Sequence, residues 1–164
     1  MAALRIDGGR LWQSLMQMAE IGPGVAGGNN RLAFSPEDDA ARGLFCRWCA
    51  AEGLALSADR FGNQFATRAG TEDLPPLLIG SHLDTQPTGG RFDGVLGVLA
   101  GLEVMRCLNA GGVRTSRPVT LVNWTNEEGT RFAPAMLASG VFAGVHERDW
   151  AYERTDAKGK KFGD

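Results

Sequence analysis

Two short stretches of the 164-residue chain combine the residue types of a hydrolytic metal site. In the first, GSHLDTQPTGGRFDG (80–94), one histidine and two aspartates surround a glycine-rich turn that follows the apolar run 77–79. In the second, VTLVNWTNEEG (119–129), an apolar run ends in two adjacent glutamates. Imidazole and carboxylate groups bind divalent cations, and they are costly to bury unless they are paired or metal-bound. Together the stretches predict a metal site that activates water for hydrolysis.

His82 and Asp84 stand two positions apart, directly after the first apolar run. In an extended segment two such side chains share a face, so the Asp84 carboxylate is expected to orient the His82 ring. The alternative is a hydrogen-bonded histidine at a strand end beside a surface aspartate. Taken alone, the pair favours that alternative, and the metal interpretation depends on the other acidic residues.

Asp93, Glu127 and Glu128 are those acidic residues. Asp93 precedes an apolar segment, where aspartate is often a plain N-cap, but a carboxylate has enough lone pairs to cap a helix and also to bridge cations. Glu127 and Glu128 are adjacent and repel each other, so without a cation one of them is pushed toward its neutral form. A cation removes that penalty and allows one glutamate to be a ligand and the other a general base.

The sequence favours structural roles for the three cysteines and for the second histidine. Cys46 and Cys49 form a CxxC motif well inside a predicted helix, whereas redox pairs of this kind begin a helix, and no second pair of ligands completes a zinc site. We expect both to pack in the core, and Cys107 to be a small buried hydrophobe. His146 stands in a polar stretch that is typical of a surface loop.

Apolar periodicity and helix-start signals predict the elements that must position these residues. Ser35, Pro36 and the acids after them are a strong helix start, and Gly53 is a typical C-terminal stop. The predicted elements are helices over 9–21, 36–52 and 94–108, a strand pair within 54–68, and single strands over 77–82 and 118–124.

The segment from 77 to 124 decides the fold class. It reads as a strand, a helix and a second strand, and such crossovers connect parallel strands of one sheet. Because parallel strands end at the same edge, where open α/β sheets bind ligands, His82 and the Glu127–Glu128 pair are expected to converge there. We therefore predict an α/β fold with a mixed, largely parallel sheet flanked by helices.

Composition excludes several other classes of protein. The net charge of −2 and the absence of a long basic block argue against nucleic-acid binding. No apolar run is long enough to span a bilayer, and the N-terminus has no secretory signal pattern. Three cysteines do not form an even disulfide framework, which favours a cytoplasmic protein.

A family resemblance is carried by four stretches of the sequence: GGNNR, DRFGNQFATRAG, SHLDTQPTGGRFDG and TNEEGTRFAPAMLASGVFAG. The chain resembles the amidase branch of the M20-type dinuclear metallohydrolases, which contains N-carbamoyl-L-amino-acid hydrolases, β-ureidopropionases and allantoate amidohydrolases. The resemblance implies a zinc-exopeptidase-like catalytic domain with two divalent ions, which zinc, manganese, cobalt or nickel could supply. It implies that His82 binds one ion, Glu128 binds the other and Asp93 bridges them. Glu127 is then the general base, and Asp84 holds the His82 ring.

The family resemblance also implies a substrate for this site and further segments beyond those of this chain. The expected reaction is hydrolysis of a linear ureido C–N bond, with an N-carbamoyl-L-amino acid as substrate. The alternatives are an aminoacylase or dipeptidase of the wider family, or a non-catalytic fragment. Relatives of this kind are homodimers that continue further, with two more metal-binding histidines and a separate lid and dimerisation domain. We therefore expect residues 1–164 to be the N-terminal part of the catalytic domain, without the lid, and inactive alone.

Overall fold

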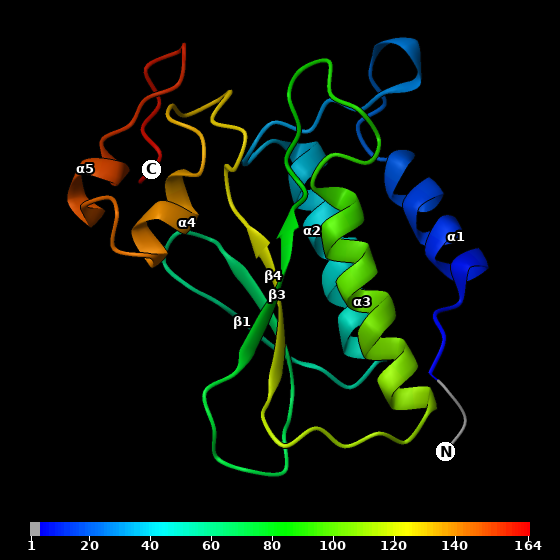
Figure 1. The fold of residues 1–164 in the computed structure, drawn as a ribbon. Coiled ribbons are helices and arrows are strands. Elements are labelled where there is room, and N and C mark those ends of the chain that lie inside the picture. The colour runs from blue at the N-terminus through cyan, green and yellow to red at the C-terminus, as the bar shows by residue number, and fades with distance from the viewer. Residues whose placement is uncertain (1–3) are drawn as a thin grey trace.

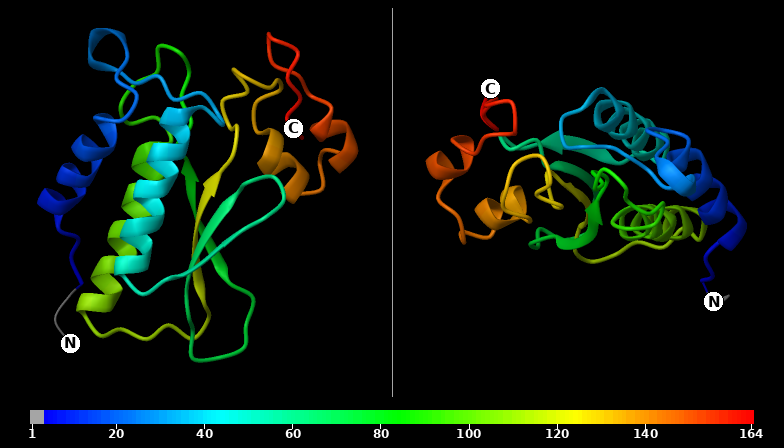
Figure 2. Two further views of the ribbon diagram at one scale, coloured as in Figure 1. Left: turned by 180° about the vertical axis from the view of Figure 1, so that it is seen from behind. Right: turned by 90° about the horizontal axis from the view of Figure 1, so that it is seen from above.

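The computed structural model describes residues 4–164, which form a four-stranded sheet with helices on both sides (Figures 1 and 2). Helices α1, α2 and α3 lie against one face, and the short helices α4 and α5 lie on the other side. In chain order the elements are α1 (Gly8–Ala19), the 3-10 turn η1 (Val25–Gly27), α2 (Pro36–Ala51), β1 (Ala55–Ala58), β2 (Gln64–Arg68), β3 (Leu77–His82), α3 (Val95–Ala110), β4 (Val119–Trp124), α4 (Leu137–Phe142) and α5 (Arg148–Tyr152).

The local signals in the sequence explain where α2 begins and ends. The Ser35 hydroxyl accepts a hydrogen bond from the backbone N–H of Asp38 at 3.2 Å, and Pro36 occupies the first helical position. After the last turn, Gly53 adopts a φ of +71°, which glycine tolerates at no steric cost. The predicted helix over 36–52 is therefore confirmed.

The sheet has the strand order β1-β2-β4-β3 and is mixed, as expected. It is not largely parallel, because only β3 and β4 run parallel, while β2 is antiparallel to both β1 and β4. For β1 and β2 the physical reason lies in the tight turn 59–63, where the Asp59 carboxylate accepts from the N–H groups of Phe61 and Asn63. So short a connection can join only antiparallel neighbours.

The parallel pair β3 and β4 places the candidate site. Its register runs from Leu77 opposite Val119 to His82 opposite Trp124, so the two strands end side by side. The loops that follow, one leading to α3 and the other carrying the two glutamates, leave the same edge of the sheet (Figure 1). The sequence predicted that the candidate metal-binding and catalytic residues converge at this edge.

Apolar side chains of α1, α2 and α3 form the main core against the sheet. A smaller buried cluster holds the C-terminal segment beside it. On that side of the sheet, the Phe142 ring packs on Phe65 and Trp124 with centroid distances of 5.9 and 5.0 Å, whereas Leu78 of β3 stays exposed. The largest buried core residues are Met18, Phe45, Leu83, Leu99, Leu102, Met105 and Leu121 in the main cluster, and Phe132 and Leu137 in the smaller one.

The three cysteines are free thiols without a site of their own. Cys49 is fully buried on α2, and burial raises the pKa of its thiol to about 12. Cys46 lies half-buried one turn earlier, where the Gln64 amide contacts its sulfur at 3.2 Å. Both positions are those of packing residues, as predicted. His146 lies in the bend between α4 and α5, with its ring centroid 5.2 Å from that of Trp150.

Among residues 4–164 we find no helix with the length and apolar character that a membrane-spanning segment needs.

Candidate metal centre

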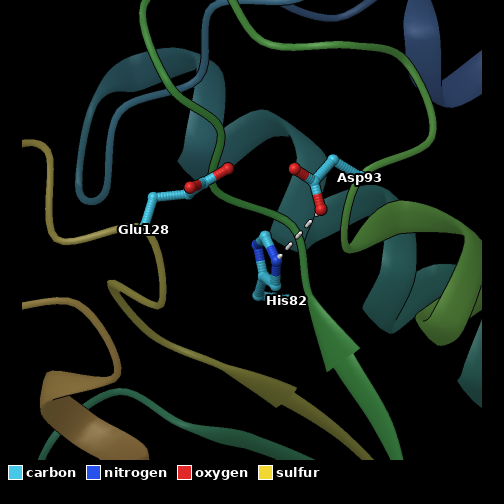
Figure 3. A group of neighbouring side chains, drawn as sticks. All are labelled: His82, Asp93 and Glu128. Carbon is cyan, nitrogen blue, oxygen red and sulfur yellow. Dashed lines mark ion pairs between the residues drawn. The ribbon is translucent and has the colours of Figure 1, made fainter.

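His82, Asp93 and Glu128 converge at the carboxyl edge of the parallel strands (Figure 3). His82 is the last residue of β3, Asp93 stands before α3, and Glu128 lies in the loop after β4. Each offers one ligand atom, and these atoms all lie within 4.8 Å of one another. The structure thus brings together the three residues for which the sequence predicted a metal-binding role.

The His82 imidazole is nearly buried and its orientation is fixed by the backbone. Its Nδ1 lies 2.9 Å from the carbonyl oxygen of Asp84. Because a carbonyl oxygen only accepts, Nδ1 of the neutral ring carries the proton, and Nε2 presents its lone pair to the crevice. Nε2 is the nitrogen that faces the carboxylates, at 3.9 Å from Asp93 Oδ1 and 3.3 Å from Glu127 Oε2.

This arrangement of acceptor atoms fits a divalent cation. The Nε2 lone pair and the carboxylate oxygens of Asp93 and Glu127 face one another, and Glu128 adds a further carboxylate. Acceptors at such distances repel unless a proton or a cation lies among them. Imidazole nitrogen and carboxylate oxygen are ligands that zinc, manganese, cobalt and nickel all accept.

The role of Asp84 differs from the one predicted. Its carboxylate Oδ1 is 3.7 Å from His82 Nδ1, too far for a hydrogen bond, and the backbone carbonyl holds the ring instead. The carboxylate accepts from the backbone N–H groups of Glu127 and Glu128, each at 3.2 Å. The physical reason is that β3 ends at His82, so the alternation of an extended strand does not continue to Asp84.

Asp84 is therefore a buried connection between the two loops of the site. It is 1% exposed, and burial raises the pKa of its carboxyl to about 6, against the opposing effects of nearby His82 and of the two backbone N–H groups. The sequence offered no signal for this contact, because the partners are 43 and 44 positions apart.

Asp93 does not cap α3. The N-cap position belongs to Gly94, which has a φ of +66°, and no side chain caps the helix there. The Asp93 side chain is 67% exposed and its carboxylate is free to face His82. Gly94 is required by a close approach, since a Cβ at this position would lie 2.4 to 2.6 Å from three atoms of the His82 ring.

Three polar residues that sequence reasoning did not single out shape the loop after β4. The Asn126 side chain donates to the carbonyl of Phe132 and accepts from its N–H, while its backbone adopts a φ of +54°. Asparagine tolerates this left-handed conformation better than most residues, which is a signal that a sequence can carry. The Asn63 side chain accepts from the N–H of Thr125 at 2.9 Å. Gln86 donates from Nε2 to Glu128 Oε2 at 3.0 Å.

The chain is similar to several known proteins. Residues 78–160, about half of the chain, match the model of peptidase family M20/M25/M40. The chain is 60% identical over 161 residues to an N-carbamoyl-L-amino-acid amidohydrolase of Rhizobium meliloti, covering 98% of this chain and 39% of that protein. It is 43% identical to an N-carbamoyl-L-amino acid amidohydrolase of Geobacillus stearothermophilus, covering 94% of this chain and 38% of that one.

Among solved structures, a hydantoinase/carbamoylase family amidase from Burkholderia ambifaria matches with a TM-score of 0.96 and 56% identity. That match covers 98% of this chain and 39% of the amidase chain. The chain therefore spans about 39% of the length of such relatives.

Proposed function

Because the chain belongs to peptidase family M20/M25/M40, we propose that His82, Asp93 and Glu128 are metal ligands of an amidohydrolase. The proposed reaction is hydrolysis of the ureido C–N bond of an N-carbamoyl-L-amino acid. The observation that carries the proposal is the convergence of the three ligand atoms within 4.8 Å at the carboxyl ends of β3 and β4. The substrate class rests on the names of the relatives that are 60% and 43% identical to the chain.

We assign His82 to one divalent ion, Glu128 to a second and Asp93 to a position between them. Such cations act as Lewis acids and lower the pKa of water. Each ion then has two protein ligands within residues 4–164, fewer than the three that catalytic zinc sites usually take from the protein. We therefore expect the 164-residue polypeptide by itself to bind metal weakly and to be inactive.

Glu127 is the proposed general base. Its Oε2 lies 3.3 Å from His82 Nε2, at the centre of the crevice, and its side chain is partly exposed and so accessible to water and substrate. It takes a proton from the attacking water and returns it to the leaving nitrogen as the C–N bond breaks. The products are the amino acid and carbamate, which decomposes to carbon dioxide and ammonia.

Asp84 supports these residues without touching the substrate. Its carbonyl holds the His82 ring, and its carboxylate holds the backbone of Glu127 and Glu128. The backbone that carries the adjacent glutamates is thus fixed relative to His82.

Two further proposals concern the whole protein. We place it in the cytoplasm, because all three cysteines of the chain are free thiols. We also keep the homodimer that the resemblance implies as a proposal. Both can be checked on a protein that spans the full length of the relatives, by localisation and by solution mass.

A chimera tests the metal chemistry. In it, this chain replaces the matching segment of the Rhizobium meliloti amidohydrolase, to which it is 60% identical. We expect the chimera to hydrolyse an N-carbamoyl-L-amino acid, and the Glu127→Gln version to keep its metal and lose turnover. A folded, metal-loaded chimera without activity, or an active Glu127→Gln version, would contradict the assignment.

The substrate class needs a protein that contains this chain and spans the relatives' full length. Rates on an N-carbamoyl-L-amino acid, allantoate, an N-acetyl amino acid and a dipeptide are compared at equal concentration. We expect the N-carbamoyl compound or allantoate to react fastest. Faster cleavage of the dipeptide or the N-acetyl compound would place the protein with the peptidases or aminoacylases of the family.

A further inference from the structure

The loop 83–93, which connects His82 to Asp93, is hydrogen-bonded to the GGNNR stretch near the N-terminus. Asn29 and Gly89 exchange two backbone hydrogen bonds, at 2.9 and 3.1 Å. The Thr85 N–H donates to the Arg31 carbonyl at 2.8 Å, and the Arg31 N–H donates to the Thr85 hydroxyl at 2.8 Å. Segment 29–31 therefore lies beside the loop and fixes its backbone at two points.

Arg31 is the buried side chain at the centre of this contact. It is 0% exposed, and its Nε donates to the carbonyl of Leu83 at 3.1 Å. Its Nη1 donates to the carbonyls of Ile21 at 2.9 Å and Met18 at 3.4 Å. One guanidinium thus connects the last turn of α1 and the residues just after it to the residue after His82.

Leu83 lies between the two residues that organise the site. His82 precedes it, and Asp84 follows with the carbonyl that holds the His82 ring and the carboxylate that holds the loop of Glu127 and Glu128. A shift of the Leu83 carbonyl therefore moves both at once. The Arg31 guanidinium is planar and rigid and holds its N–H donors in fixed directions, so it defines where the Leu83 carbonyl lies.

We propose that Arg31 is a positioning residue of the metal centre, which holds loop 83–93 in place through the Leu83 carbonyl and Thr85. The inference rests on the metal-binding role proposed above for His82 and Asp93. If Arg31 were only a general stabiliser of the fold, its removal would loosen the whole sheet equally. If it positions the site, the effect is concentrated in the two loops that face each other.

Arg106 provides a matched control. It is also buried, and it also connects two helices, since its Nη1 donates to the Ser14 hydroxyl of α1 at 3.0 Å. It stands twelve residues along α3 from Gly94, which corresponds to roughly 18 Å of helix. Removing it costs that hydrogen bond and the ion pairs with Glu52 and Glu103 without touching either loop of the site.

The experiment uses the chimera described above, in which this chain replaces the matching segment of the Rhizobium meliloti amidohydrolase, and its Arg31→Met, Arg31→Lys and Arg106→Met variants. Amide hydrogen exchange without metal is followed in peptides that cover 80–94, 125–130 and the hairpin 55–68. Co²⁺ affinity and resistance to denaturant are measured on the same samples. Lysine keeps the positive charge but lacks the planar guanidinium, so Arg31→Lys gives a milder variant if Arg31→Met fails to fold.

We expect both Arg31 variants to speed exchange in 80–94 and 125–130 more than in the hairpin, and Arg31→Met to weaken Co²⁺ binding by about 10–100-fold. Arg106→Met should lower stability with Co²⁺ affinity unchanged. Uniform acceleration across the sheet, or equal Co²⁺ affinity in Arg31→Met and Arg106→Met, would overturn the proposal. If the unmodified chimera does not bind Co²⁺ at all, the metal assignment is what fails, and the exchange pattern still decides whether Arg31 positions the loop.

Discussion

Replacing Gly94 by alanine should damage the metal centre through a single methyl group. A Cβ at this position would lie 2.4 Å from Cε1, 2.5 Å from Nε2 and 2.6 Å from Cδ2 of His82. Ordinary carbon contacts are about 3.5 Å, so the ring or the start of α3 must retreat by roughly 1 Å. The ring has little room to retreat, because His82 is 5% exposed and its Nδ1 is bonded to the Asp84 carbonyl.

Two separate costs follow from this geometry. At Gly94 a φ of +66° with a ψ of −51° lies in a region that residues with a Cβ rarely adopt, which costs an alanine roughly 1–3 kcal/mol of folding stability. The displacement of about 1 Å is several times the tolerance of about 0.2 Å in metal–ligand distances, so His82 is lost as a ligand. We expect metal affinity to fall by about 100-fold or more, beyond the effect of losing an outer partner.

Gly112→Ala separates the two costs. Gly112 lies just past the other end of α3 and has a φ of +61°, and a Cβ added there would meet no atom within 4 Å. It therefore carries the backbone cost without the clash. In the chimera, denaturant unfolding should show a loss of stability for Gly112→Ala and a larger loss for Gly94→Ala, because the clash adds to the backbone cost. Co²⁺ or Mn²⁺ titration should show weakened binding only for Gly94→Ala. Equal metal affinity in the two variants would refute the placement of His82 as a ligand.

Substitutions of other residues test their separate roles. In a protein of the relatives' full length, Glu128→Ala should lower metal occupancy while Glu127→Gln keeps it, because only Glu128 is assigned as a ligand; unchanged metal content in Glu128→Ala would reverse the two roles. Asp84→Asn should speed amide exchange at Glu127 and Glu128 and weaken metal binding severalfold, because a side-chain amide cannot accept from both N–H groups as a carboxylate does; exchange at the unmodified rate would show that the contact is dispensable. Cys49 should react with a thiol reagent only on unfolding, because burial raises the pKa of its thiol to about 12; timed labelling of the folded chain checks this, and rapid modification of Cys49 would contradict it.

Local signals were sufficient to predict most of the elements. The strand over 77–82 has the predicted bounds, and α3 lies within two residues of its prediction. Caps, stops and apolar periodicity depend on neighbours along the chain, so they can be read without the fold. The family resemblance, carried by the motifs around His82 and Glu127, is confirmed by the match to peptidase family M20/M25/M40.

The strand pairing could be predicted only in part. The crossover through α3 implied that β3 and β4 are parallel, and they are. That β2 lies between β1 and β4, antiparallel to both, depends on which strands meet after the chain collapses. Sequence spacing does not report that choice, and the expectation of a largely parallel sheet was wrong for this reason.

By itself, the sequence determined which residue types gather at the carboxyl edge of the sheet, because parallel strands joined by one helix must end together. Only the tertiary structure decided how those residues are held. The Asp84 carboxylate binds N–H groups 43 and 44 positions away, Arg31 reaches a carbonyl 52 positions away, and Gly94 abuts the His82 ring. Such contacts depend on the path of the backbone in three dimensions, and a hydrogen bond or a clash of about 1 Å leaves no trace in residue spacing.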